Sequence, residues 1–119
     1  MKVLVTGGAG FIGSHLVERL TELGHKVLVI DNLSSGFEKN LERVRDKIEL
    51  IKADISSKGI YKYVRGQDII FHLAAIPDPR SCDKHIKETF NSNVSGTFNI
   101  LLSAAKNDVK KVVFLSSAH

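Results

Sequence analysis

Near its start the chain reads Val3-Leu4-Val5-Thr6-Gly7-Gly8-Ala9-Gly10-Phe11-Ile12-Gly13, an apolar run that breaks into closely spaced glycines. A short apolar run of this kind is typical of a strand buried on both faces of a parallel sheet. Apolar residues then recur at helical intervals, at Ile12, Leu16, Leu20 and Leu23. The stretch therefore predicts a strand, a tight turn and a helix.

The glycines of this turn have separate mechanical uses. Gly7 and Gly8 let the chain turn sharply, Gly10 lets backbone approach a ligand, and Gly13 allows close packing of helix and strand. The first turn of the following helix offers unpaired N–H groups and a positive dipole end, which suit the phosphates of a dinucleotide. Glycine-rich turns also occur for purely structural reasons, so the turn alone leaves both interpretations open.

The sequence after the first helix favours the dinucleotide. Gly24 is a plausible helix stop, and the apolar run at 26–30 ends at Asp31, 18 residues after Gly13. A carboxylate at the end of the second strand can accept hydrogen bonds from the adenosine ribose and would repel a 2′-phosphate. The pattern predicts NAD rather than NADP. The alternative is that Asp31 is only a turn residue.

Strand and helix patterns alternate along the remainder of the 119 residues, which suit a single domain. Residues 34–47 suggest a loop leading into a short helix, 59–66 a short helix, and the region from Phe90 to Lys106 a long amphipathic one. Apolar runs predict further strands at 48–53, 68–75 and 111–119. The fold class is therefore α/β, with a parallel sheet in the order 3-2-1-4-5 and the ligand at the carboxyl ends of strands 1 and 4.

Two segments resemble a known family. The run from Thr6 to Leu16 looks like the T-G-x-x-G-x-x-G opening of the extended short-chain dehydrogenase/reductases, the NAD-dependent nucleotide-sugar epimerases and dehydratases. The run from Asp31 to Gly36 is similar to the segment after the second strand in UDP-glucose 4-epimerases. The resemblance implies a Rossmann-type doubly wound sheet, NAD as cofactor, a UDP-sugar substrate, and hydride transfer between sugar C4 and NAD.

The same resemblance assigns cofactor-binding positions. Asp54 and Ile55 match a pair that holds adenine, although Asp54 is equally well explained as an N-cap acid before the next helix. Both interpretations can hold together if Ser56 or Ser57 is the actual cap. Asn93 matches an asparagine that contacts the cofactor region. We expect His72 to be a satisfied core histidine. The complete set of expected cofactor-binding residues is Gly7, Gly10, Phe11, Ile12, Gly13, Asp31, Asn32, Asp54, Ile55, Leu73, Ala74, Ala75 and Asn93.

The catalytic machinery implied by the resemblance is incomplete within residues 1–119. Ser117 matches the catalytic Ser/Thr position, but the expected Y-x-x-x-K does not occur. We expect this chain alone to be inactive: an incomplete NAD-binding domain truncated after strand 5 or, alternatively, a non-catalytic dinucleotide-binding module. The prolines of loop 76–80 do not match epimerase versions of that loop. An uncovered strand 5 predicts self-association or poor order at this end. The resemblance implies a homodimer through the 84–106 helix and the helix after it, and we expect this dimer to be weakened because the second helix does not occur within residues 1–119.

Composition argues against other classes of function. The net charge is +4, but Lys and Arg are interleaved with Asp and Glu, so we expect no nucleic-acid partner. No long apolar stretch predicts a membrane span or a signal peptide, and the expected location is cytoplasmic. Cys82 is the single cysteine, which precludes an internal disulfide. Cys82 and His85 are spaced like half a metal site, and without a second pair we expect no metal.

Overall fold

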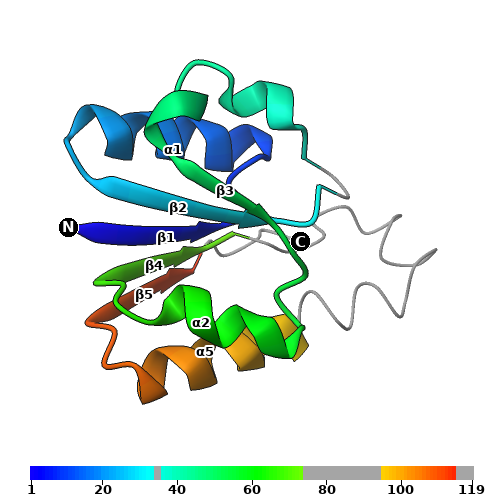
Figure 1. Ribbon diagram of the computed structural model, residues 1–119, viewed down its shortest axis with the longest axis vertical. Coiled ribbons are helices and arrows are strands. Elements are labelled where there is room, and N and C mark those ends of the chain that lie inside the picture. The colour runs from blue at the N-terminus through cyan, green and yellow to red at the C-terminus, as the bar shows by residue number, and fades with distance from the viewer. Residues whose placement is uncertain (34–35, 74–94, 115–119) are drawn as a thin grey trace.

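The computed structural model describes residues 1–33, 36–73 and 95–114. Within them, one five-stranded parallel sheet has the order β3-β2-β1-β4-β5, which confirms the predicted topology. Its strands are β1 (Lys2–Thr6), β2 (Lys26–Asp31), β3 (Glu49–Lys52), β4 (Ile69–His72) and β5 (Lys111–Phe114). Figure 1 shows the sheet between two helical layers. The strand order reverses between β1 and β4, and such a switch point opens a ligand crevice at the carboxyl ends.

Three helical elements cover each face of the sheet in the part of the chain that the structure describes. On one face lie α1 (Phe11–Glu22) and the 3-10 helices η1 (Glu38–Leu41) and η2 (Arg45–Lys47). On the other lie η3 (Lys58–Ile60), α2 (Tyr61–Val64) and α5 (Gly96–Lys106). The single short helix expected within 34–47 is therefore two separate 3-10 turns. The sheet has a separate hydrophobic core on each face, because successive residues of a strand point to opposite faces.

The sheet divides the hydrophobic core into two clusters. Val3 and Val5 of β1 point toward α1, where Val17 and Leu41 are fully buried with them. Leu4, between them in sequence, points the other way. It lies with Ile60, Val64, Ile70 and Ile100 in the cluster under α2 and α5. The three apolar residues of β1 thus alternate between the two clusters, as a doubly covered parallel strand requires.

The periodicity predicted α1 correctly but did not identify its buried face. Of the four apolar positions that indicated this helix, only Leu20 is buried, while Ile12 and Leu23 are 55% and 56% exposed. Gly13 and Val17 face the sheet instead. The helix ends as predicted: Gly24 has φ of 86°, and the His25 amide donates to the Leu20 carbonyl at 3.1 Å. This six-to-one bond is typical of a glycine-terminated helix.

The long helix shows the same discrepancy. α5 ends at Lys106, as predicted, and its described part begins at Gly96. The helical pattern rests on Phe90, Val94, Phe98, Leu101 and Ala105, and the two large side chains among its described members are exposed: Phe98 is 65% and Leu101 44% accessible. Ile100 and Ala104 are buried instead. Because α5 carries apolar residues on two faces, one of them packs on the sheet and the other is left on the surface.

Candidate functional site at the carboxyl ends of the strands

The glycine-rich turn connects β1 to α1 in four residues. Gly7 has φ of 74°, in the left-handed region that favours glycine, and its amide donates to the Ile30 carbonyl of β2 at 2.8 Å. Gly10 is the N-cap of α1, and its amide donates to the Gly7 carbonyl at 3.2 Å. The turn is therefore bonded both to itself and to the neighbouring strand.

The first turn of α1 leaves backbone donors unused. The first backbone bond into the helix runs from the Ser14 amide to the Gly10 carbonyl, at 2.8 Å. In the described part of the chain, the amides of Phe11, Ile12 and Gly13 have no acceptor. Together with the helix dipole, such orphan amides attract an anion. A Cβ on Gly10 would meet only the Gly7 carbonyl oxygen, at 3.4 Å, so a ligand can approach this side of the turn.

Gly13 is required for a different reason. An ideal Cβ on it would lie 2.3 Å from the Gly7 carbonyl oxygen and 2.9 Å from the Gly8 Cα. Both obstacles are backbone atoms of the turn. Any side chain at residue 13 would therefore push α1 away from the turn that precedes it.

Asp31 joins the end of β2 to the turn. Its side chain is 7% exposed, and its Oδ2 accepts the Ala9 amide at 2.9 Å. Its Oδ1 accepts the Leu33 amide at 2.7 Å, so Asp31 is also the turn residue of the alternative interpretation. A carboxylate has about four lone-pair sites, so two such bonds leave capacity for ribose hydroxyls. Leu33 itself has φ of 61°, a left-handed conformation that is uncommon for a residue other than glycine.

Asp54 follows β3 at the same edge of the sheet. Its Oδ1 accepts both the amide and the hydroxyl of Ser56, at 2.9 and 2.8 Å. Asp54 therefore stabilises a turn, and Ser57 is the N-cap of η3 without a side-chain cap bond. The Oδ2 of Asp54 has no donor in the described residues and the side chain is exposed. One carboxylate oxygen thus remains open to an amine donor.

Asn99 of α5, which the sequence patterns did not single out, fixes the neighbouring loop. Its Nδ2 donates to the carbonyls of Ile55 and Ser57, both at 2.7 Å. The bonds tie α5 to the segment that carries Asp54 and Ile55. No periodicity could indicate this role, because the contact joins residues more than 40 positions apart.

His72 connects three elements at the end of β4. Its Nδ1 lies 2.7 Å from the Thr6 Oγ1 of β1, and its Nε2 lies 2.8 Å from the Thr97 Oγ1 of α5. The ring also meets Phe114 of β5 edge to face, with centroids 5.6 Å apart. Burial lowers the pKa of His72 from 6.5 to about 4, so the ring is neutral at pH 7. The prediction of a satisfied core histidine is confirmed.

The carboxyl edge of the sheet gathers most of the expected site residues that the structure describes. The glycine turn and Asp31 are in direct contact, Asn32 follows Asp31, Asp54 and Ile55 follow β3, and Leu73 follows β4. The amide of Leu73 donates to the Thr6 carbonyl at 3.0 Å. Ala74, Ala75, Cys82, His85, Asn93 and Ser117 lie outside the described residues.

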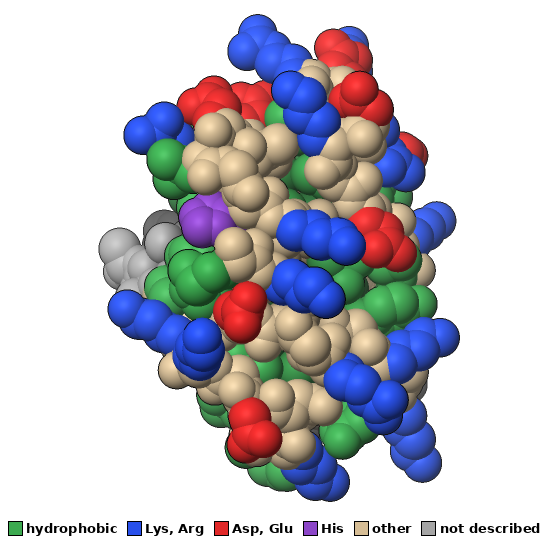
Figure 2. All heavy atoms as spheres, turned by 60° about the vertical axis from the view of Figure 1, so that its left-hand side comes forward, with side chains coloured by type: hydrophobic (Ala, Val, Ile, Leu, Met, Phe, Trp, Pro, Cys, Tyr) green, Lys and Arg blue, Asp and Glu red, His purple; other side chains and the backbone are tan. Residues whose placement is uncertain are grey.

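The opposite edge of the sheet carries mixed charge. Figure 2 shows Lys and Arg spread over this face with Asp and Glu between them, rather than gathered in one patch. Such mixing is typical of a solvated surface. Among the helices that the structure describes, none has the length and apolar character to span a membrane.

Comparison with known proteins places these features in a family. The model of the NAD dependent epimerase/dehydratase family matches residues 3–119. The chain is 43% identical over 122 residues to a UDP-glucose 4-epimerase of Mycolicibacterium smegmatis, covering 98% of this chain and 39% of the relative. It is 41% identical over 118 residues to a UDP-N-acetyl-alpha-D-glucosaminuronate decarboxylase of Bacillus cytotoxicus, covering 98% of this chain and 36% of the relative.

A solved structure extends the similarity to three dimensions. The Thermus thermophilus UDP-glucose 4-epimerase in complex with NAD aligns with a TM-score of 0.86 and 35% identity. The alignment covers 96% of this chain and 37% of that one. The chain therefore spans a little over a third of the length of these relatives. Sequence and fold agree that this chain belongs to the NAD dependent epimerase/dehydratase family, whose cofactor is NAD and whose Rossmann-type sheet it shares.

Proposed function

We propose that residues 1–119 are the NAD-binding part of a nucleotide-sugar epimerase of the UDP-glucose 4-epimerase type. The observation that carries the proposal is the buried Asp31 carboxylate, held 2.9 Å from the Ala9 amide beside a helix whose first amides have no acceptor among the described residues. In a dinucleotide the diphosphate lies next to the ribose. The site likewise places hydrogen-bond donors, the first amides of α1, next to an acceptor, the Asp31 carboxylate.

Each binding group has an assigned task in this proposal. The amides of Phe11, Ile12 and Gly13 hold the diphosphate, and Asp31 accepts the adenosine ribose hydroxyls. The open Oδ2 of Asp54 accepts the amino group of adenine. NAD, when bound, would supply the hydride acceptor and donor for reversible oxidation at sugar C4, and the hydride would return to the opposite face of the sugar. Ser117, by family resemblance, hydrogen-bonds the sugar hydroxyl that is oxidised.

The partners and location belong to the proposal as well. The substrate is a UDP-sugar in the complete enzyme. The exposed apolar residues Phe98, Leu101 and Leu102 of α5 support pairing of two copies through the 84–106 segment. The cytoplasmic location stays a prediction.

Titration with NAD tests the binding role, with the protein at its natural length. We expect Asp31→Ala to weaken NAD binding by about 1–3 kcal/mol, because charge-assisted hydrogen bonds to the ribose are lost. Asp46→Ala is the control, since Asp46 is an exposed carboxylate in η2 at the other edge of the sheet. Equal NAD affinity in the Asp31 variant and the wild type would contradict the ribose role.

The reaction needs its own assay, because the chain is 43% identical to a UDP-glucose 4-epimerase and 38% identical to a UDP-glucuronic acid decarboxylase of Arabidopsis thaliana. UDP-glucose, UDP-galactose and UDP-glucuronic acid are supplied separately, and the products are identified by chromatography and mass. Interconversion of UDP-glucose and UDP-galactose is expected. Loss of CO₂ from UDP-glucuronic acid, without interconversion of UDP-glucose and UDP-galactose, would contradict the epimerase activity and indicate a decarboxylase. NAD binding with no turnover of any of the three would favour the non-catalytic module.

A further inference from the structure

The polar groups of Ala9, in the middle of the glycine-rich turn, are held by the last residue of β2 and by residues that follow this strand. Ala9 is fully buried. Its carbonyl oxygen accepts the Asn40 Nδ2 at 2.8 Å and the Phe37 amide at 3.1 Å. Its own amide donates to Asp31 at 2.9 Å. The turn is therefore bonded on its outer side to the connection between β2 and β3.

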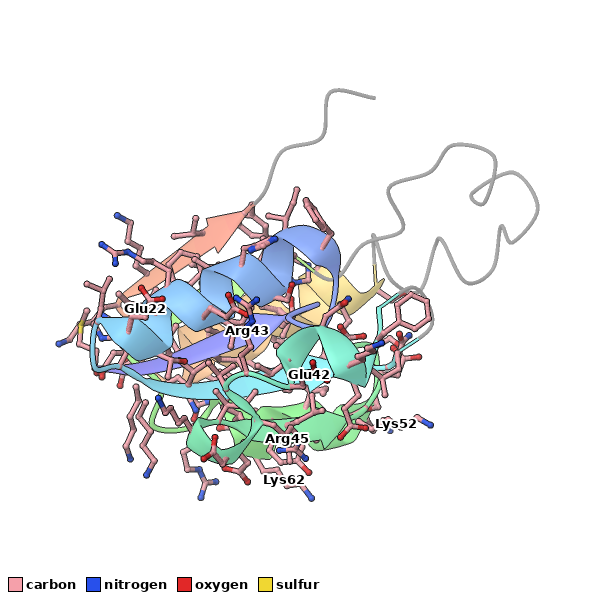
Figure 3. The ribbon with its side chains drawn as sticks, turned by 90° about the horizontal axis from the view of Figure 1, so that it is seen from above. Glu22, Glu42, Arg43, Arg45, Lys52 and Lys62 are labelled. Atoms are coloured by element: carbon pink, nitrogen blue, oxygen red, sulfur yellow. The ribbon has the colours of Figure 1, made fainter. Side chains whose placement is uncertain are left out.

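The contact between the two segments is close enough to exclude a side chain. An ideal Cβ on Gly36 would lie 2.8 Å from both the carbonyl carbon and the oxygen of Ala9, and 3.0 Å from the Gly10 nitrogen. Asn40 lies in η1, and Figure 3 shows η1 beside α1 on the same side of the sheet. Leu41, the next residue, is fully buried in the core. The buried Leu41 side chain therefore anchors η1, and η1 in turn holds Asn40 against the glycine-rich turn.

These bonds fix the orientation of one peptide plane. The carbonyl of Ala9 and the amide of Gly10 belong to the same planar peptide unit. The carbonyl is held by Asn40 and Phe37, and the amide is held by the Gly7 carbonyl at 3.2 Å. A rotation of this plane would displace the first amides of α1 and would break all three bonds. It would also free a carbonyl dipole whose negative end repels an anion.

We propose that Asn40 is a positioning residue for the diphosphate, acting through the Ala9 carbonyl on the glycine-rich turn. This inference rests on the proposed NAD-binding function. Asn40 bonds the turn and not the ligand, so its effect is confined to the part of the nucleotide that the turn binds. Removing the Asn40 side chain lowers the affinity for a ligand that carries a diphosphate and leaves the affinity for a ligand without one nearly unchanged.

The test compares Asn40→Ala with Asn107→Ala in the protein at its natural length. Asn107 is the matched control, because its Nδ2 also donates to one backbone carbonyl at 2.8 Å, that of Ser103. It lies beyond the end of α5, away from the glycine turn. The probes are ADP and adenosine, and the binding of each to each variant is measured by NMR titration. We expect Asn40→Ala to weaken ADP binding about threefold to tenfold and adenosine binding less than about twofold. Asn107→Ala changes neither.

A readout without nucleotide separates positioning from binding. Hydrogen exchange of the Gly10 amide is expected to accelerate in Asn40→Ala and not in Asn107→Ala. Should Asn40→Ala fail to fold, Gly36→Ala disturbs the same contact from the other side, and the same selective loss of ADP affinity is expected. Unchanged ADP binding, or equal weakening of ADP and adenosine, overturns the positioning role alone. A wild type that binds neither NAD nor ADP overturns the proposed function and the positioning role together.

Discussion

Gly13→Ala and Gly10→Ala should separate the stability of the glycine-rich turn from its binding role. The methyl group at residue 13 would lie 2.3 Å from the Gly7 oxygen, whereas real Cβ atoms essentially never approach within 3.0 Å. The backbone must therefore move by about 0.7 Å, and no flexible side chain is available to yield. Overpacking against a rigid neighbour costs about 1–3 kcal/mol. We expect a loss of unfolding free energy near the upper end of that range.

Gly10→Ala should leave the stability nearly unchanged and lower the affinity for NAD. Its methyl group meets only the Gly7 oxygen, at an ordinary contact distance of 3.4 Å, and the N-cap has φ of −75° and ψ of 176°, which alanine adopts readily. Stability should change by less than about 1 kcal/mol. The methyl group nevertheless occupies the side from which the diphosphate approaches, so NAD affinity should fall at least about tenfold, or 1.4 kcal/mol.

The assay is urea unfolding, followed by circular dichroism, together with NAD titration of each variant. Gly59→Ala in η3 is the control, because a Cβ there meets no atom within 4 Å. It should leave both quantities nearly unchanged. A Gly13→Ala variant as stable as Gly59→Ala would refute the packing argument. A Gly10→Ala variant with wild-type NAD affinity would refute the assigned approach of the diphosphate.

Two further predictions concern other parts of the molecule. His72 has a folded-state pKa of about 4, below its unfolded value of 6.5, so the stability it confers is complete above pH 6.5 and is lost as the pH falls toward 4. Urea unfolding should show a loss of roughly 1 kcal/mol between pH 7.5 and pH 5.5, reduced in His72→Gln, and an equal loss in that variant would rule out His72 as the cause. On α5, Phe98→Glu places a charge on a side chain that is 65% exposed. It should shift sedimentation toward monomers without altering NAD affinity. Lys47→Glu, at an exposed lysine of η2 outside the 84–106 segment, should change neither the sedimentation nor the NAD affinity. An unchanged mass for Phe98→Glu would exclude this face from the interface.

The predictions that succeeded from sequence alone depend on local chemistry. Three consecutive apolar residues, Val3 to Val5, become a strand covered on both faces, and the glycines after them become a turn because few other residues adopt its conformation. The stop of α1 at Gly24 follows from its left-handed φ. Parallel pairing and right-handed crossovers then leave few orders for alternating strands and helices, and the predicted order was correct.

Tertiary structure decided which face of each helix is buried. Both α1 and α5 carry apolar residues around more than one side, so periodicity identifies the helix without identifying the face that meets the sheet. Val17 and Ile100 are buried, while Ile12 and Phe98 are exposed. The choice depends on how each helix is rotated by its connections and on the close approach that Gly13 permits, which are properties of the assembled layers.

The supporting bonds of the site were also beyond the reach of the sequence. Asp31 could be singled out as a candidate, because a carboxylate at the end of the second strand has a known chemical use at that position, and its role toward NAD stays a prediction. Asn40 and Asn99 could not, because each donates to a backbone carbonyl more than 30 residues away, and every residue of the chain offers such a carbonyl. The sequence by itself determined the strand, the turn and the helix that form the candidate site. Only the tertiary structure decided how they are held, since a hydrogen bond between distant segments exists only once the fold brings them together.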